Sequence, residues 1–435
     1  MIAKVLGRLR SGHSGNIAWS LAGFVVPLAV GLVFIPLIIR QMGVELFGVL
    51  SIIWMLIGYF TLFDLGISRA LTYLLSRNIG AGEVERNQLV YSTALPVVGI
   101  MGLLGGVLFW SCSEVLATRV FNVDAALIPA VRDAFRWTAI AIPFTIWATV
   151  MRSCLESYAE FRLINLVKIP INAWFLVGPY AFYLFSDSFS LAVLSLLLAR
   201  IAMFVAYLLA NQRHLRFSVG AIQPALLKEL FAFGGWMTVS NVVSPIMVYF
   251  DRFLIGSFLS VTLVGYYSAP YEIVTKVLVV PIAIASVLFP AVSKALSERN
   301  VEEVRSLIKR FGMLIAGLVG VVTLCLISAG GWGLEWWLGP EFREQGYWVL
   351  FWISLGVLFN SLAQVPFCVI QASGASKVTA LIHLAEVPLY LVALSVALVW
   401  YQSISAVAFV WCLRVLVDLL VLTWVSGRLV DAKAR

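Results

Sequence analysis

The sequence predicts an all-α, polytopic membrane protein with about twelve transmembrane helices, and three observations lead to this prediction. Hydrophobic residues make up 62% of the 435 residues, charged residues make up only 12%, and the mean hydropathy is +0.98. Soluble domains carry roughly 25% charged residues, about twice this density. The composition therefore excludes a soluble enzyme, a secreted disulfide scaffold and a disordered chain.

Twelve apolar runs follow one another along the chain, and each is long enough to form a membrane-spanning helix. They cover residues 16–39, 47–70, 89–111, 134–155, 163–185, 189–210, 230–258, 263–292, 311–333, 346–370, 378–400 and 403–426. Prolines recur within these runs, which membrane helices tolerate and which often mark kinks. No small-x-small cleavage site follows the first run, so we expect a retained span rather than a signal peptide.

The basic residues predict the orientation of the chain, because cytosolic loops of membrane proteins retain lysine and arginine. With a cytosolic amino terminus, eighteen of the 30 Lys and Arg residues fall in inner segments, four in outer segments and eight within the runs. Both termini are therefore expected to face the cytosol. The net charge of +8 then reflects topology, and no nucleic-acid partner is expected.

The second half of the chain resembles the first half at an offset of 217 residues. Trp19 aligns with Trp236, and residues 44–48 align with residues 261–265. Chance alignment of leucine-rich helices would explain single matches, but a common offset favours duplication. Since each repeat holds an even number of spans, both halves keep the same orientation, as in parallel-repeat transporters.

This duplication predicts two pseudo-symmetric six-helix bundles around a central cavity. The first bundle is expected over residues 1–212 and the second over residues 230–435. Residues 213–229 are expected to form a cytosolic linker between them.

Ionisable residues inside the predicted spans are expensive to bury and usually face the bundle interior or water. The runs contain Arg69, Arg136, Arg152, Lys168, Arg200, Arg252, Lys276 and Arg414, together with Asp64, Asp251, Glu272, Glu386 and Asp418. The excess of basic residues would suit an anionic substrate, and arginine recognises phosphate especially well. The alternative interpretation is a set of structural ion pairs and snorkelling side chains.

Several motifs resemble the polysaccharide-transport, or oligosaccharide flippase, family. Residues 35–48 (IPLIIRQMGVELFG) are similar to the end of the first span in that family, where a proline, an arginine and a G-x-x-x-F/Y-G turn lead into the second span. Residues 64–71 resemble the second span of the family, and residues 249–256 and 264–268 resemble its seventh-to-eighth span region. The family belongs to the multidrug/oligosaccharidyl-lipid/polysaccharide exporter superfamily, and the resemblance covers nearly the whole chain.

The resemblance implies a flippase that moves undecaprenyl-pyrophosphate-linked oligosaccharides from the inner to the outer leaflet of a bacterial plasma membrane by alternating access. Relatives that flip the peptidoglycan precursor have fourteen spans, so twelve spans favour an O-antigen or other surface-polysaccharide repeat unit. The implied partners are the lipid-linked oligosaccharide, membrane lipids, a polysaccharide polymerase and a chain-length regulator. No cofactor is expected beyond a coupling ion, H⁺ or Na⁺.

The residues expected to contact such a substrate are basic side chains that would bind the pyrophosphate, tyrosines that would bind the sugars, and one aspartate. They are Arg40, Asp64, Arg69, Arg152, Arg200, Arg252, Lys276, Tyr249 and Tyr271. The candidates for ion coupling are Asp64, Asp251, Glu272, Glu386 and Asp418. No catalytic residue or metal ligand is predicted, and the chain is not expected to be an enzyme.

Two alternative functions stay open from the sequence. An ion-coupled drug or metabolite antiporter of the same superfamily would favour an acidic cavity, which the excess of basic residues does not predict. A membrane polysaccharide polymerase or ligase would build its site on large outer loops. The longest expected outer loop runs only from about Ser113 to Asp133.

Overall fold

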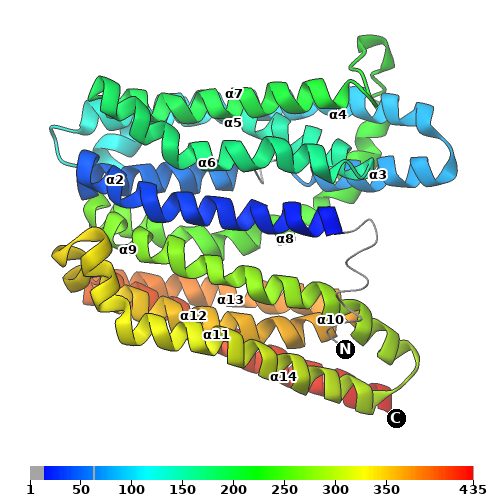
Figure 1. Cartoon of the computed structure of the whole chain (residues 1–435). Coiled ribbons are helices and arrows are strands. Elements are labelled where there is room, and N and C mark those ends of the chain that lie inside the picture. The colour runs from blue at the N-terminus through cyan, green and yellow to red at the C-terminus, as the bar shows by residue number, and fades with distance from the viewer. Residues whose placement is uncertain (1–13, 62–63, 435) are drawn as a thin grey trace. The chain divides into compact units, whose positions relative to one another are not determined.

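The computed structural model describes residues 14–61 and 64–434, and this part of the chain is helical with no β-strand (Figure 1). The side chains of residues 14–25, 232–246, 248–249, 376 and 433–434 lie outside the description. The chain divides into two units, Met1–Pro245 and Ile246–Arg435. This division falls inside a helix, whereas the sequence places the linker at residues 213–229, so the expected lobe boundaries stay a prediction.

The first unit is built from long helices joined by short turns. Its helices are α2 (Ser14–Phe60), α3 (Ile67–Ala81), α4 (Val84–Val115), α5 (Ile128–Ser157), α6 (Phe161–Ser186), α7 (Phe189–Asn211) and the start of α8 (Ala225–Phe258). A π-helical turn, η1 (Leu116–Val120), extends α4, and a 3₁₀ turn, η2 (Val219–Ala221), precedes α8.

The second unit takes the end of α8 and six further α-helices. They are α9 (Val261–Val274), α10 (Val279–Ser297), α11 (Val301–Leu338), α12 (Pro340–Ala372), α13 (Ser376–Val396) and α14 (Ile404–Ala434). A 3₁₀ turn, η3 (Thr275–Leu278), joins α9 to α10, and a π-helical turn, η4 (Ala397–Tyr401), extends α13.

Helices lie in all twelve predicted runs, which confirms the all-α membrane architecture. Within the described residues, ten helices are long and apolar enough to cross a membrane. This number counts α2 as one span, although α2 contains the first predicted run and part of the second. It leaves out α8, many of whose side chains are not described.

In each half, the helical path of the backbone is interrupted after the first span, and the two interruptions lie at equivalent positions. In α2 the helical path breaks at Gly43, where φ is 83° and ψ is 163°. Only glycine adopts this region without strain, because it has no Cβ. At the offset of 217 lies Ser260, an extended residue whose hydroxyl oxygen accepts a hydrogen bond from the Leu263 N–H at 3.2 Å and so caps α9.

The second predicted span of each half is not one uninterrupted α-helix, which the apolar runs do not reveal. In the first unit the chain leaves α2 at Phe60 and resumes in α3 at Ile67, inside the predicted run 47–70. In the second unit η3 separates α9 from α10, inside the predicted run 263–292. The first of these predicted spans therefore contains a turn that includes Asp64, whereas the second passes through a short 3₁₀ stretch and stays helical from Val261 to Ser297.

Turns with a positive φ angle recur at nearly the same offset. The pairs are Gly82 with Arg299, Ala159 with Gly374, and Asp187 with Gln402. Each member of these pairs follows the last turn of a helix, where a left-handed residue satisfies the final carbonyl groups. The repeated turns support the predicted duplication, whereas the central cavity between the bundles stays a prediction.

Close packing of α4 against α5 depends on glycine. A Cβ atom at Gly102 would lie 2.8 Å from the Cα atom of Pro143, and one at Gly106 would lie 2.8 Å from the carbonyl oxygen of Ala139. Small residues at such positions let membrane helices approach each other closely. Beside this pair, α5, α6 and α7 share an apolar core that includes Ala148, Met203 and Tyr207, and these three residues also border a large cavity.

Candidate functional site

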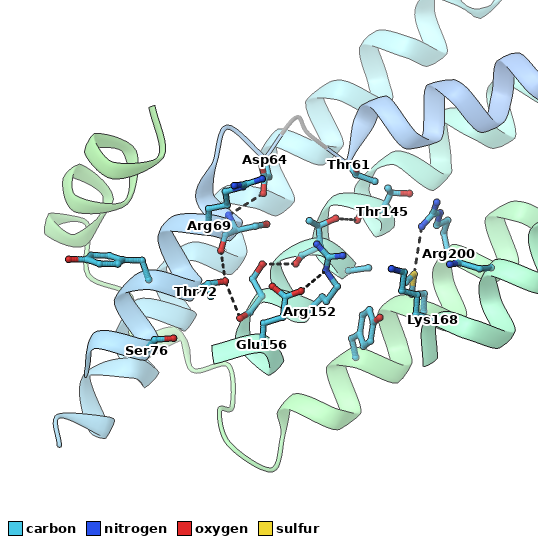
Figure 2. A pocket seen from close by; sticks show the side chains of 18 of the residues that line it. Thr61, Asp64, Arg69, Thr72, Ser76, Thr145, Arg152, Glu156, Lys168 and Arg200 are labelled. Atoms are coloured by element: carbon cyan, nitrogen blue, oxygen red, sulfur yellow. Dashed lines mark hydrogen bonds and ion pairs between the residues drawn. The ribbon is translucent and has the colours of Figure 1, made fainter. Parts of the chain in front are cut away.

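A cavity of about 1060 Å³ lies inside the first unit, among α3, α5, α6 and α7 (Figure 2). Most of its lining residues are polar or charged, although they come from helices that are otherwise apolar. They are Thr61, Asp64, Ser68, Arg69, Thr72, Tyr73, Ser76, Arg77, Thr145, Ala148, Thr149, Arg152, Ser153, Glu156, Lys168, Asn172, Arg200, Met203 and Tyr207.

Helical periodicity explains why α3 contributes so many of these side chains. Ser68, Thr72 and Ser76 are spaced four residues apart, and so are Arg69, Tyr73 and Arg77. Residues at this spacing lie above one another on one face of a helix. The two stripes are adjacent, so together they give α3 one broad polar face toward the cavity.

Asp64 shapes the turn that starts this polar face. Its carboxylate accepts hydrogen bonds from the N–H groups of Gly66 at 3.0 Å and Ser68 at 3.1 Å. These bonds satisfy the free donors at the start of α3, and an anion there interacts favourably with the helix dipole. Leu65 and Gly66 adopt positive φ angles in the same turn. Asp64 therefore has a structural role that also places Arg69 at the cavity.

The α5 wall carries one ion pair and is tied to α3. Arg152 Nε lies 3.4 Å from Glu156 Oε1, one helical turn further along (Figure 2). The Thr72 hydroxyl lies 3.3 Å from the Ser153 carbonyl oxygen, where it donates a hydrogen bond across from α3 to α5. Arg152 is therefore held within a hydroxyl-rich wall and already has one carboxylate partner.

Arg200, from α7, lies in the cavity without a carboxylate. Its guanidinium stacks on the Phe175 ring at 4.4 Å and lies 3.6 Å from Met203 Sδ, and its buried Nε has no hydrogen-bond partner. Lys168 of α6 likewise has no ion pair within the described part of the chain. Both side chains therefore keep donors for an incoming anion.

The charges of the cavity are strongly unbalanced. Five cationic side chains line it, Arg69, Arg77, Arg152, Lys168 and Arg200, whereas only two carboxylates do so, Asp64 and Glu156. Most of the other lining residues are Ser, Thr or Asn, whose side chains both donate and accept hydrogen bonds. The cavity is thus suited to an anionic, hydroxyl-rich ligand.

Four predicted substrate contacts meet in this cavity, namely Asp64, Arg69, Arg152 and Arg200. Arg40 does not line it and lies exposed on α2. The prediction for Tyr249 falls on a side chain outside the described residues.

Several cavity residues are absent from the predicted site, among them Arg77, Glu156 and the hydroxyl side chains. Their four-residue spacing on α3 and α5 is the one sequence signal that points to them.

Arg252, Tyr271 and Lys276 lie together in the second unit, around Glu272. Arg252 is only 2% exposed, its Nη1 lies 3.3 Å from Glu272 Oε1, and its guanidinium stacks on the Tyr271 ring at 4.1 Å. Lys276 Nζ lies 3.1 Å from the other oxygen of Glu272. In this conformation the guanidinium of Arg252 is enclosed and paired, so its contact with substrate stays a prediction.

Asp251 is also satisfied within the second unit. The Tyr267 hydroxyl donates a hydrogen bond to Asp251 Oδ2 at 2.5 Å, and the Arg252 N–H donates one to Oδ1 at 2.7 Å. Of the five predicted ion-coupling residues, Asp64, Asp251 and Glu272 therefore already have protein partners.

Glu386 and Asp418 differ from the other three, because their carboxylates lie close together and most of their oxygen atoms lack a hydrogen-bond partner within the described residues. They are 8% and 6% exposed, and both oxygens of Glu386 and Oδ1 of Asp418 have no hydrogen-bond partner. His383 joins them, with its Nε2 3.5 Å from Asp418 Oδ1, and Arg414 Nε lies 4.0 Å from Glu386 Oε2. One ligand atom from each of His383, Glu386 and Asp418 can be chosen so that all three lie within 4.8 Å of one another.

His383 is not among the residues predicted for ion coupling. Its spacing of three residues from Glu386 on one helix face is the signal that points to it.

A multi-span helical protein whose charged residues line a cavity among its helices has the architecture of a membrane transporter. A family model described as polysaccharide biosynthesis protein matches residues 37–344. The chain belongs to this family, which confirms the resemblance found in the sequence.

Two relatives extend over most of the chain. A Shigella flexneri protein named "Putative O-antigen transporter" is 30% identical over 414 residues, which cover 95% of this chain and 97% of that protein. A Bacillus subtilis (strain 168) protein, "Uncharacterized membrane protein EpsK", is 21% identical over 384 residues and covers 85% of this chain and 74% of that protein.

Solved structures share the fold at low sequence identity. An inward-facing multidrug resistance MATE family transporter of the MOP superfamily superposes with a TM-score of 0.81 at 12% identity, covering 95% of this chain and 98% of that one. The lipid II flippase MurJ in an inward closed conformation gives a TM-score of 0.75 at 15% identity, with 96% and 90% coverage. Several of these proteins are named transporters or flippases and none is named an enzyme, in agreement with the predicted absence of enzymatic activity.

Proposed function

We propose that this protein is a flippase for a polyprenyl-pyrophosphate-linked oligosaccharide, with an O-antigen or other surface-polysaccharide repeat unit as the sugar. The observation that carries the proposal is the cavity of the first unit, where five cationic side chains face two carboxylates. The relative named "Putative O-antigen transporter" supports the class of substrate, and the lipid II flippase shares the fold.

The physical problem is to move a charged, hydrated headgroup through a hydrocarbon layer. Pyrophosphate is an anion that arginine and lysine can neutralise with charge-assisted hydrogen bonds. In the cavity Arg69, Lys168 and Arg200 have no ion pair within the described chain, and they provide such donors without first losing a partner. The neighbouring hydroxyl groups would bind the first sugars, while the polyprenyl tail stays in the lipid.

The transport step is proposed to be alternating access, from the inner to the outer leaflet of a bacterial plasma membrane with both termini in the cytosol. A cavity open to one side would take up the headgroup, and rearrangement of the bundles would open it to the other side. A polysaccharide polymerase and a chain-length regulator are the proposed partners that would use the delivered repeat unit.

We further propose that H⁺ or Na⁺ drives the cycle at Glu386 and Asp418. Two buried carboxylates this close repel each other unless a proton or a cation neutralises one of them. His383 supplies a third side chain that can bind a proton, and Arg414 supplies a competing positive charge. Asp64, Asp251 and Glu272 are weaker candidates because protein groups already satisfy them.

The direct test is leaflet-resolved transport of a defined lipid-linked oligosaccharide by the purified protein in proteoliposomes. We expect the labelled headgroup to become accessible on the opposite leaflet only in vesicles that contain the protein. A matched lipid-linked sugar without the pyrophosphate should not be moved. Equal rates in empty and protein-containing vesicles would contradict the proposal.

The same preparation separates the two alternative functions. An antiporter would move organic cations or metabolites against an ion gradient and leave the lipid-linked oligosaccharide in place. A polymerase or ligase would lengthen or transfer the oligosaccharide, which mass analysis of the recovered lipid would detect.

A further inference from the structure

One of the five cations in the cavity already has an internal anionic partner from another helix. Arg77, at the end of the polar face of α3, places its Nη2 3.0 Å from Oε1 of Glu229 in α8. Arg86 of α4 places its Nη2 3.3 Å from the other carboxylate oxygen. The carboxylate of Glu229 thus bridges two arginines, only one of which lines the cavity.

We propose that Glu229 is a resident anion that competes with the substrate pyrophosphate for Arg77, so that headgroup binding exchanges one ion-pair partner for another. This inference rests on the proposed function, because it takes the pyrophosphate as the competing ligand. It assigns Glu229 a role in setting the affinity of the cavity.

The position of Arg77 makes such an exchange possible. Arg77 follows Arg69 and Tyr73 on one face of α3, and its guanidinium lies 5.9 Å from the centroid of the Tyr73 ring. A ligand in the cavity therefore meets the same guanidinium that Glu229 contacts. The predicted topology puts this end of the cavity toward the cytosol, where the substrate would enter.

The pair is also exchangeable on energetic grounds. The side chains of Arg77 and Glu229 are 43% and 34% exposed, and ion pairs at such exposure contribute about 0–1 kcal/mol. The enclosed pair of Arg252 and Glu272 is different, because a ligand would have to reach a guanidinium that is only 2% exposed.

Arg86 would keep an acidic partner after Glu229 leaves. Its Nη1 lies 3.7 Å from Oε2 of Glu83, three residues earlier. Release of Glu229 therefore leaves Arg86 paired while it frees Arg77 for the phosphate. The arrangement therefore favours exchange of Glu229 for phosphate at Arg77, the arginine that lines the cavity.

The helix that carries Glu229 gives the exchange a wider consequence. Glu229 lies in the second turn of α8, and the same helix carries Asp251 and Arg252 in the second unit. Loss of the contacts of Glu229 with Arg77 and Arg86 would release the first turns of this shared helix.

The experiment measures binding of inorganic pyrophosphate to the purified full chain in detergent, by calorimetry at low ionic strength. Glu229→Gln keeps the size of the side chain and removes its charge. We expect it to bind pyrophosphate about three- to tenfold more tightly, as follows from the loss of two competing surface ion pairs. Glu83→Gln, which removes an acid that pairs with Arg86 only, should leave the affinity unchanged.

A double-mutant comparison localises the effect. In an Arg77→Gln background, Glu229→Gln should no longer tighten binding, because the shared guanidinium is absent. Glu229→Ala serves as a second charge-removing variant if Glu229→Gln does not fold.

Unchanged or weaker binding in the folded Glu229 variant, or an equal gain in Glu83→Gln, would overturn the inference and leave Glu229 as a structural clamp. Absence of pyrophosphate binding in both wild type and variant would overturn it as well. Tighter pyrophosphate binding without any transport of lipid-linked oligosaccharide would instead contradict the proposed function alone.

Discussion

Arg200 places a guanidinium in the cavity with no carboxylate partner among the described residues. Its contacts are the face of Phe175 and the sulfur of Met203, and its Nε makes no hydrogen bond. An arginine held in this way keeps its hydrogen-bonding capacity for a ligand. Arg152, by contrast, shares its charge with Glu156.

Replacing Arg200 should therefore weaken headgroup binding more than replacing an arginine outside the cavity. We expect Arg200→Gln to lower the affinity for pyrophosphate by about tenfold or more, since a hydrogen bond from a charged group contributes about 1.5–3 kcal/mol. Arg162→Gln is the control, because Arg162 is exposed on the same unit and does not line the cavity. Equal losses in both variants would indicate a general effect of net charge.

The carboxylate pair of Glu386 and Asp418 leads to a separate prediction about how an ion gradient drives transport. Removing one charge, by Glu386→Gln or Asp418→Asn, leaves the remaining carboxylate without a neighbour that repels it. We expect transport in proteoliposomes to lose its dependence on an imposed H⁺ or Na⁺ gradient, while pyrophosphate binding in the first unit changes less than about twofold.

The control for this measurement is Glu298→Gln, which removes an exposed carboxylate that pairs only with Lys294. Gradient-dependent transport that persists in both Glu386→Gln and Asp418→Asn would rule out this pair as the coupling site.

The sequence predicts the cations of the site better than their partners. A basic residue in an apolar run stands out against its neighbours, which is why Arg69, Arg152 and Arg200 could be found. Glu156 follows the end of such a run, and hydroxyl residues are common in membrane helices, so neither is conspicuous. Whether Arg252 pairs with Glu272 or faces a cavity depends on helix rotation, which composition does not determine.

Among the elements, the contact between α4 and α5 allows a test of how far the packing of two membrane helices depends on small side chains. Gly102→Ala would put a Cβ atom 2.8 Å from the backbone of Pro143, which cannot rotate away. We expect a loss of about 1–3 kcal/mol in stability, as in other overpacked contacts, and a lower melting temperature in detergent.

The matched control is Gly105→Ala in the same helix. Its added Cβ would meet only the Ile142 side chain, at 3.7 Å, which is an ordinary van der Waals distance. Its melting temperature should stay the same or rise slightly, because alanine favours helix over glycine. A similar drop in both variants would mean that glycine is needed here for flexibility rather than for space.

At the level of helices, the predicted runs locate every span but not the breaks within them. The turn at Asp64, Leu65 and Gly66 interrupts an apolar run, because the Asp64 carboxylate offers the backbone N–H groups an alternative to the helix. The 3₁₀ turn at η3 has no comparable sequence marker. The turn at Asp64 follows from local hydrogen bonding, which hydropathy does not measure.

For the whole molecule, the distribution of basic residues predicts an orientation in the membrane, and this orientation can be tested in intact cells. In a cysteine-free background, Arg119→Cys should react with a membrane-impermeant thiol reagent added from outside. Arg299→Cys, in the turn after α10, should react only after the membrane is permeabilised. Labelling of Arg299→Cys in intact cells would reverse the predicted orientation and, with it, the proposed direction of transport.

The paired turns at Gly82 and Arg299, Ala159 and Gly374, and Asp187 and Gln402 have a consequence for how the two halves could specialise. Backbone geometry at these bends is shared, yet the side chains differ even there, since two of the pairs place glycine against a larger residue. A duplicated frame of this kind tolerates divergence in its interior, because the bends do not depend on what the helices enclose. Within the described residues, the first copy thus holds Lys168 and Arg200 without a carboxylate partner, whereas the second holds the buried carboxylates Glu386 and Asp418 close together, so the two copies have diverged toward opposite charge.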